Sequence, residues 1–156
     1  MGSKHWIALL VLIVVSGSLL AQRQSRSSPS PQPAPVAPLK VDGAPVQLAS
    51  GVEYWDIRKG TGGAAVPGMR LKVHYTGWLT NGKKFDSSFD RGEPFTFQLG
   101  KHRVIRGLEE GLKGMRVGGV RQVRVPPAMA YGRRGSGAEI PPNSTLVFDV
   151  ELLGTY

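Results

Sequence analysis

Residues 104–115, with the sequence VIRGLEEGLKGM, decide the fold expected for this chain. Four of their apolar side chains recur at intervals of four, four and three, which is typical of one short helix with a single apolar face. This apolar stripe consists of Val104, Leu108, Leu112 and Met115. The charged residues off the stripe are expected to stay in water, namely Glu109, Glu110 and Lys113.

A helix of this length with glycines inside it would not persist alone. Each interior glycine costs roughly 0.5–1 kcal/mol relative to alanine, and even alanine-rich helices shorter than about 12–15 residues are marginal in water. The flanking sequence supplies strand patterns rather than partner helices. We therefore expect one helix that packs against a curved antiparallel sheet.

Alternation of apolar and polar residues predicts the strands of this sheet. They are expected over residues 52–58, 71–75, 95–99 and 146–153, with a further strand that contains Val123 and Val125. A hairpin turn is expected at Asn81-Gly82, because both central positions of a two-residue turn favour positive φ, and residues 83–88 follow it. About five strands and one helix indicate an α+β domain of roughly 105 residues.

The first 21 residues have the composition of an export signal. A short basic start is followed by Ile7–Val15, which contains no polar residue, and then by small residues that end at Ala21. The apolar run is short for a membrane span, which needs about 20 residues, so we expect a cleaved signal peptide. An uncleaved signal anchor formed by residues 6–21 is the alternative.

Residues 22–50 are expected to form a flexible linker rich in proline and serine. Ser25–Leu39 contains almost no large apolar side chain, and such a segment cannot bury enough surface to offset its ordering entropy. A proline-rich ligand for a partner's aromatic groove is the functional alternative, but a plain tether is the preferred interpretation. The folded domain is then expected over residues 51–156.

The composition excludes several classes of site. The chain has no cysteine, so a thiol nucleophile, a disulfide and a lipid-modified cysteine anchor are excluded. The Gly-x-Ser-x-Gly elbow and the phosphate-binding glycine loops are missing too. The three histidines are too far apart for a local metal motif, and His74 is expected at a strand edge or in a structural hydrogen bond. We expect no metal, no cofactor and, because the net charge of +9 is scattered without a recognised motif, no nucleic acid.

Aromatic residues gather near the turns of the expected sheet. They are Tyr75, Phe85, Phe95, Phe97, Tyr131 and Phe148. As core residues of a small sheet domain they would need no functional explanation, and for Phe97 this interpretation is sufficient. Phe85-Asp86 differs, because a carboxylate beside a buried ring costs several kcal/mol unless it has a partner.

Seven short motifs match a known family in order and spacing. They are Val73-His74-Tyr75-Thr76-Gly77, Gly82-Lys83-Lys84-Phe85-Asp86-Ser87-Ser88, Pro94-Phe95, Val104-Ile105-Arg106-Gly107, Ala130-Tyr131-Gly132, Ile140-Pro141-Pro142 and Leu146-Val147-Phe148-Asp149-Val150-Glu151-Leu152. Together they closely resemble the FKBP family of peptidyl-prolyl cis–trans isomerases, from about Gly51 to the C-terminus. The resemblance implies five or six antiparallel strands wrapped around one short α-helix, with an active pocket between the helix and the concave face of the sheet.

The resemblance also implies which residues form the site. Catalytic roles fall on Phe85, on the pocket carboxylate Asp86 and on Tyr131, which matches the hydroxyl donor of the long loop. The substrate-binding positions are Tyr75, Arg91, Phe95, Val104, Ile105, Leu108, Ile140 and Phe148. Within this set Arg91 is the expected salt-bridge partner of Asp86, the backbone N–H of Ile105 holds a ligand carbonyl, and Ile140 covers the pocket.

Two positions depart from the family pattern. Leu108 stands where well-studied members place tryptophan on the pocket floor, which keeps the floor apolar but makes it shallower. Glu139 replaces an apolar loop residue at the rim. These departures bear on the affinity for macrolide inhibitors and on substrate preference.

The sequence therefore predicts an exported prolyl isomerase, periplasmic or otherwise extracytoplasmic, that assists protein folding. Its expected substrates are proline-containing polypeptides, and macrolide inhibitors are expected ligands of the same pocket. The alternative is a non-catalytic chaperone module that grips proline-containing segments on the same fold. A monomer is expected, because no dimerising helix precedes the domain, and membrane contact is expected only through an uncleaved N-terminal segment.

Overall fold

The computed structural model describes residues 32–156. The predicted signal segment 1–21 and the first part of the predicted linker, residues 22–31, lie outside the described residues. No helix within residues 32–156 has both the length and the apolar composition that crossing a membrane requires.

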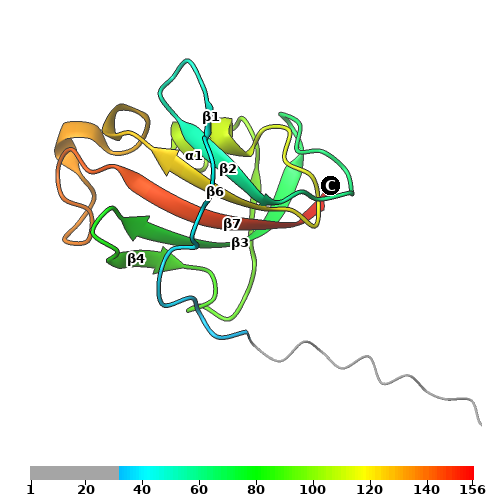
Figure 1. Ribbon diagram of the computed structural model, residues 1–156, viewed down its shortest axis with the longest axis horizontal. Helices are drawn as coiled ribbons and strands as arrows, with labels where there is room; N and C mark the ends of the chain where they lie inside the picture. Colours follow the sequence, from blue (N-terminus) through cyan, green and yellow to red (C-terminus); the bar gives the residue numbers. More distant parts are fainter. Residues whose placement is uncertain (1–31) are drawn as a thin grey trace, which may run out of the picture. The chain divides into compact units, whose positions relative to one another are not determined.

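Seven strands form one antiparallel sheet that curves around a single α-helix (Figure 1). In chain order the elements are β1 (Val46–Gln47), β2 (Glu53–Arg58), β3 (Arg70–Leu79), β4 (Lys84–Ser87), β5 (Phe95–Gln98), α1 (Arg106–Leu112), β6 (Val120–Val125), the 3-10 turns η1 (Pro127–Met129) and η2 (Gly132–Arg134), and β7 (Leu146–Thr155). The strand order is β1-β2-β6-β7-β3-β4, and β5 pairs with β3 beside this path. The predicted α+β fold is confirmed, with β1 as a short additional strand.

The α1 helix lies close to β6, and two of its glycines explain how. A Cβ atom at Gly107 would lie 2.2 Å from Cγ1 of Val125, and one at Gly111 would lie 2.4 Å from Cγ1 of Val123. Real Cβ atoms do not approach other atoms so closely, so only glycine fits at either position. The glycines that weaken the isolated helix therefore permit its packing on the sheet.

The helix is shorter than the predicted span of residues 104–115. Ile105 has an extended backbone (φ −59°, ψ 147°), and Lys113 leaves the helix with ψ 134°. The apolar stripe is still buried at Leu108, Leu112 and Met115. Its spacing therefore identified the buried face correctly but overestimated how far the helical backbone continues.

Glu109 was expected in water, and this expectation is wrong. Its side chain is only 6% exposed. One carboxylate oxygen accepts the backbone N–H groups of Gly100 (3.1 Å) and His102 (2.9 Å). The loop that precedes α1 folds over the helix and supplies these donors, which a helical projection does not include.

The hairpin between β3 and β4 forms where it was predicted, but with a different turn. Gly82 donates its N–H to the carbonyl of Leu79 (2.9 Å), so Thr80 and Asn81 are the central residues. Gly82 follows with φ +84°, while Asn81 is absent from the residues with positive φ in the described part of the chain. The loop is thus one residue longer than the expected Asn-Gly turn, and glycine is needed only at its last position.

Part of the predicted linker belongs to the folded domain. Residues 46–47 form β1 on the edge of β2. The backbone N–H of Leu39 donates to the Asp149 carboxylate (2.9 Å), and its carbonyl accepts from the Gln122 amide (2.8 Å). In Figure 1 this segment crosses the strands on the face of the sheet turned away from α1. The segment docks on the sheet through backbone hydrogen bonds, so it needs few apolar side chains to do so.

Candidate active site

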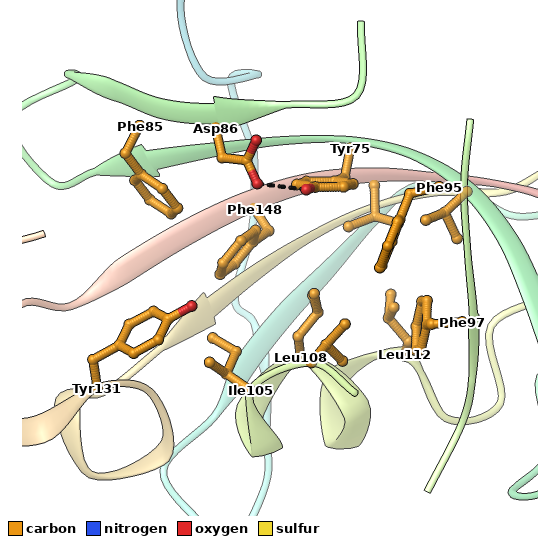
Figure 2. Close-up of a pocket in the computed structure, with 13 residues that line it drawn as sticks. Tyr75, Phe85, Asp86, Phe95, Phe97, Ile105, Leu108, Leu112, Tyr131 and Phe148 are labelled. Carbon is orange, nitrogen blue, oxygen red and sulfur yellow. Dashed lines mark hydrogen bonds between the residues drawn. The ribbon is translucent and has the colours of Figure 1, made fainter. Parts of the chain in front are cut away.

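A cavity of about 110 Å³ lies between α1 and the concave face of the sheet (Figure 2). Its walls are mainly apolar and aromatic. They are formed by Val73, Tyr75, Phe85, Asp86, Phe95, Phe97, Val104, Ile105, Leu108, Leu112, Tyr131, Phe148 and Val150. Segments spread over half of the chain therefore converge on one small volume.

The period-two geometry of the strands aims these side chains inward. Val73 and Tyr75 are two residues apart on β3, as are Phe148 and Val150 on the neighbouring β7. The register pairs Tyr75 with Val150, so both strands present the same face to the cavity. On the opposite side, Leu108 and Leu112 are one helical turn apart and form the floor.

Two pairs of aromatic rings in the cavity wall meet edge to face, whereas the Phe95 and Phe97 rings are stacked at 5.7 Å and 18°. The Phe85 and Phe148 rings are 5.7 Å apart at 88°, and the Tyr75 and Phe95 rings are 5.8 Å apart at 70°. This arrangement is a favoured geometry for aromatic pairs. Gly77 makes room for it, because a Cβ atom there would lie 2.5 Å from Cζ of Phe85 and 3.1 Å from Cε1 of Phe148.

One polar network interrupts the apolar wall. The Tyr75 hydroxyl donates to Oδ2 of Asp86 (2.5 Å). Arg91, from the loop after β4, donates to the other carboxylate oxygen of Asp86 (2.6 Å) and to the Tyr75 hydroxyl (2.9 Å). The predicted salt bridge between Arg91 and Asp86 is confirmed, and it explains how a carboxylate sits beside the Phe85 ring without an uncompensated charge.

The network also changes the acidity of its members. Burial, reinforced by the hydrogen bond to Asp86, raises the pKa of Tyr75 to about 12, although Arg91 opposes the shift. Hydrogen bonds to Tyr75 and Asp86 raise the pKa of Arg91 in turn. Tyr75 is therefore a neutral donor and Arg91 a cation at physiological pH, and the carboxylate of Asp86 is held by both.

Two hydrogen-bond donors at the cavity are not used by the described residues. Tyr131 is 41% exposed, and its hydroxyl points into the cavity (Figure 2). Within residues 32–156 neither this hydroxyl nor the backbone N–H of Ile105 has an acceptor. A bound molecule with carbonyl oxygens could accept from both.

Nine of the eleven predicted site residues line the cavity. Arg91 does not line it but holds Asp86 and Tyr75 in place. Ile140, which was predicted to cover the pocket, is not among the residues that line this cavity, and its side chain is 6% exposed and packs in the core. Backbone hydrogen bonds between Ile140 and Ser136 close its loop.

The sequence interpretation missed four lining residues, Val73, Phe97, Leu112 and Val150. Phe97 was explained as a core residue, and it is both buried and part of the cavity wall. Each of the four is two or four residues from a predicted site residue on the same element. Periodicity along each strand and helix was the signal that would have identified them.

His74 lies on the other face of β3 and is structural, as predicted. Its Nδ1 is 2.9 Å from the Ser88 hydroxyl, and its ring stacks on Phe89 at 4.3 Å. Burial lowers the pKa of His74, partly offset by the charge of Glu151. Within residues 32–156 there is no group of three His, Asp or Glu side chains that would hold a metal ion.

Comparison with known proteins connects this geometry to one family. Residues 62–153 match the family model described as FKBP-type peptidyl-prolyl cis-trans isomerase. An FK506-binding protein of Neisseria meningitidis (serogroup A) is 54% identical over 101 residues, which cover 65% of this chain and 93% of the relative. The chloroplastic peptidyl-prolyl cis-trans isomerase FKBP13 of Arabidopsis thaliana is 46% identical over 116 residues, which cover 67% of this chain and 56% of that protein.

Solved structures agree. The crystal structure of AtFKBP13 superposes with a TM-score of 0.69 at 41% sequence identity, over 73% of this chain and all of the compared chain. FkpA from Escherichia coli superposes with a TM-score of 0.68 at 43% identity, over 73% of this chain and 52% of FkpA. The sheet and helix described above are therefore shared with solved proteins of clear sequence similarity.

Proposed function

Because the chain belongs to the FKBP-type peptidyl-prolyl cis–trans isomerase family, we propose that it accelerates rotation about X–Pro bonds in exported polypeptides while they fold. Membership makes it a peptidyl-prolyl cis–trans isomerase. The export of its substrates and the role of each pocket residue are the proposed parts. The convergence of aromatic side chains, one anchored carboxylate and two free donors on a single cavity carries the proposal.

The reaction needs no nucleophile. Rotation about the X–Pro bond is slow because twisting the amide breaks its resonance, a barrier of about 18–20 kcal/mol. The twisted amide has lost conjugation, so its carbonyl is less polar than that of the planar form. A pocket that is apolar and poor in water therefore disfavours the twisted amide less than the planar one, which is differential stabilisation of the transition state.

Each pocket residue has a role in this scheme. The rings of Phe85, Phe95 and Phe148 hold the proline, and burying an apolar group of that size contributes roughly 1.5–3 kcal/mol. The N–H of Ile105 and the hydroxyl of Tyr131 donate to substrate carbonyls. Asp86 and its two partners keep the polar edge of the pocket rigid. Val104 and Leu108 complete the apolar surface.

Exchange NMR on an X–Pro peptide tests this proposal with the full-length chain. Catalysis predicts faster cis–trans exchange than in buffer. Phe85→Leu should reduce the acceleration, because it removes a ring from the cavity wall. Phe89→Leu is the matched control, since Phe89 stacks on His74 and does not line the cavity. Melting curves of both variants separate loss of activity from loss of folding.

The same experiment distinguishes an isomerase from a non-catalytic module. The observation that favours such a module is Leu108, which lines the cavity at a position where well-studied members of the family have tryptophan. A module that only grips proline-containing segments would broaden or shift the peptide signals without changing the exchange rate. Exchange at the buffer rate despite binding would therefore establish the chaperone alternative.

Export is proposed from the N-terminal composition. The basic start, the apolar Ile7–Val15 and the small residues before Ala21 are typical of an export signal. Sequencing the N-terminus of the mature protein from its native host tests this. A new N-terminus at residue 22 would establish cleavage. An intact N-terminus in the membrane fraction would establish an anchor formed by residues 6–21, and an intact N-terminus in the cytosol would contradict export.

Ligands of the FK506 type are proposed to bind the same cavity. Several relatives are named FK506-binding proteins. Leu108 offers less ring surface to such a macrolide than tryptophan does, so we expect Leu108→Trp to tighten binding. Stacking of an aromatic residue contributes about 0.5–1.5 kcal/mol beyond area burial, which corresponds to roughly a 2–13-fold lower Kd. Calorimetric titration of both forms measures it, and weaker binding by the variant would contradict this role of Leu108.

A further inference from the structure

A second cavity adjoins the active pocket. Its volume is about 360 Å³, and its lining consists of Arg70, Phe95, Thr96, Phe97, Gln98 and Arg103. Phe95 and Phe97 also line the active pocket, so the two hollows share one aromatic wall. Figure 2 places this wall at the end of the active pocket away from Phe85 and Tyr131.

The second cavity carries positive charge and no acid. Arg70 begins β3, and Arg103 lies two residues before Ile105, so the arginines approach the cavity from separate elements. Both are exposed, and none of the ion pairs found among residues 32–156 involves either of them. Tyr156 pairs with the backbone of Arg70 and leaves its guanidinium free.

The acidic side chain bound to the loop that carries Arg103 is already occupied. Glu109 is buried and accepts the N–H groups of Gly100 and His102, in the loop that carries Arg103. The only other charged or amide group of the lining, Gln98, donates its side-chain amide to the carbonyl of Gly68 (2.8 Å). The guanidinium groups are therefore the part of this cavity that is free to bind an outside partner.

Guanidinium groups select carboxylates. Their planar set of donors matches the two oxygens of an Asp or Glu side chain, and such charge-assisted hydrogen bonds are stronger than neutral ones. A polypeptide whose proline occupies the active pocket extends at most about 3.3–3.6 Å per residue. A residue only a few positions from the proline would thus reach the far side of the Phe95–Phe97 wall.

We propose that the cavity between Arg70 and Arg103 is an acidic subsite, which takes an Asp or Glu of the substrate a few residues from the isomerised proline. This inference rests on the proposed isomerase function of the neighbouring pocket. It gives the enzyme a preference for acidic sequence around proline that the apolar pocket by itself cannot supply.

A peptide series tests the subsite on the full-length protein. The peptides share one central Leu-Pro bond and differ in a single Glu, moved through each position on both sides of it, with Gln at the same position as the isosteric control. Exchange NMR gives kcat/KM for each pair. At one position the kcat/KM of the Glu peptide should exceed that of the Gln peptide by roughly two- to fivefold at low salt, as for an exposed ion pair. This ratio of kcat/KM values should fall as salt is added.

Two variants distinguish the subsite from a general positive field. Arg70→Gln combined with Arg103→Gln should abolish the preference for Glu and leave turnover of the Gln peptides unchanged. Arg133→Gln is the matched control, since Arg133 is an exposed arginine in η2, near Tyr131 at the other end of the active pocket. It should keep the preference. Melting curves verify that each variant is folded.

Different experimental results would reject the acidic subsite and the isomerase function. Equal kcat/KM for Glu and Gln peptides at every position, with clear isomerisation of both, would overturn the subsite and leave the isomerase intact. Equal loss of preference in Arg133→Gln would overturn it in favour of a general field. Absence of exchange with every peptide would instead reject the isomerase function, and the subsite with it.

Discussion

At the scale of single residues, the site is organised by three polar side chains that satisfy one another. Tyr75, Asp86 and Arg91 form a closed triangle of hydrogen bonds at the edge of an otherwise apolar cavity. A charged group beside aromatic rings is costly unless it is paired. The triangle supplies that pairing, and within residues 32–156 it engages neither the Tyr131 hydroxyl nor the Ile105 N–H.

The raised pKa of Tyr75 predicts a loss of stability in alkali. The folded protein holds this proton more tightly than the unfolded chain, with a pKa of about 12 against the ordinary 10.0. Its contribution to stability is thus complete below pH 10 and is lost as the pH rises towards 12. The free energy of unfolding in urea, measured across this range, should fall less steeply in Tyr75→Phe than in the wild type. Parallel pH profiles would contradict the assignment.

Tyr131→Phe should reduce activity without reducing stability. The hydroxyl has no acceptor among residues 32–156, so removing it breaks no bond in the free protein. A lost hydrogen bond to substrate corresponds to about 0.5–1.5 kcal/mol, or roughly a 2–13-fold lower kcat/KM. Tyr156→Phe, at an exposed tyrosine outside the cavity, is the control for exchange NMR and for thermal melting. Unchanged kcat/KM would remove Tyr131 from the mechanism.

At the scale of elements, the packing of α1 on β6 positions the pocket floor. Gly107 and Gly111 face Val125 and Val123 with no room for a side chain. Leu108, between them in sequence, points towards the cavity instead. Any outward shift of the helix would therefore move the floor and the Ile105 N–H together.

Gly107→Ala should destabilise the protein, although alanine is the better helix former by about 1 kcal/mol. The new methyl group would overlap Cγ1 of Val125, and overpacking of this kind costs typically about 1–3 kcal/mol. Urea denaturation measures the change. Lys113→Ala, at the exposed end of the helix, is the control. In Gly107→Ala/Val125→Ala the two effects should be less than additive, because the second substitution makes room for the first. Simple additivity would contradict the steric explanation.

At the scale of the whole molecule, the sheet is covered on both faces. α1 covers one face, and residues before β1 cross the other. There Asp149, only 7% exposed, accepts from Leu39, Trp78 and Gln122. Since Asp149 follows the pocket residue Phe148 on β7, the crossing segment supports the strand that carries part of the cavity wall.

Removing residues 1–50 should therefore destabilise the domain relative to a chain that begins at residue 32. The truncation deletes β1 and leaves buried Asp149 and Gln122 without their partners at Leu39. A hydrogen bond contributes about 0.5–1.5 kcal/mol to stability, and one to a charged group about 1.5–3 kcal/mol. The midpoint of urea unfolding measures the difference, and equal midpoints would show that the crossing segment contributes nothing.

A point variant separates the hydrogen bond from the chain length. Leu39→Pro removes the backbone N–H that binds Asp149 and should lower the free energy of unfolding. Val36→Pro is the control, since Val36 is 95% exposed. If both prolines have the same effect, the Leu39 hydrogen bond is not what stabilises the segment.

The accuracy of the sequence-based predictions depends on whether the feature is set by neighbours along the chain or by contacts between distant residues. Periodicity located β2, β3, β5, β6, β7 and the buried face of α1, because spacing along the chain directly sets which side chains share a face. The resemblance to a family placed nine site residues correctly on the cavity. Ile140, which the resemblance also assigns to the pocket, is not among the lining residues, and backbone hydrogen bonds with Ser136 close its loop.

The fold class, the family and five of the six aromatic residues of the pocket could be predicted from the sequence, because they follow from residue spacing and from motifs that lie in short segments. The burial of Glu109, the docking of the segment around Leu39 and the second cavity between Arg70 and Arg103 became evident only from the folded structure. Each of these joins groups from separate segments, through backbone donors and acceptors or through a shared surface. Every residue except proline has the same backbone donor and acceptor, so residue types alone do not show which backbone groups pair in the folded chain.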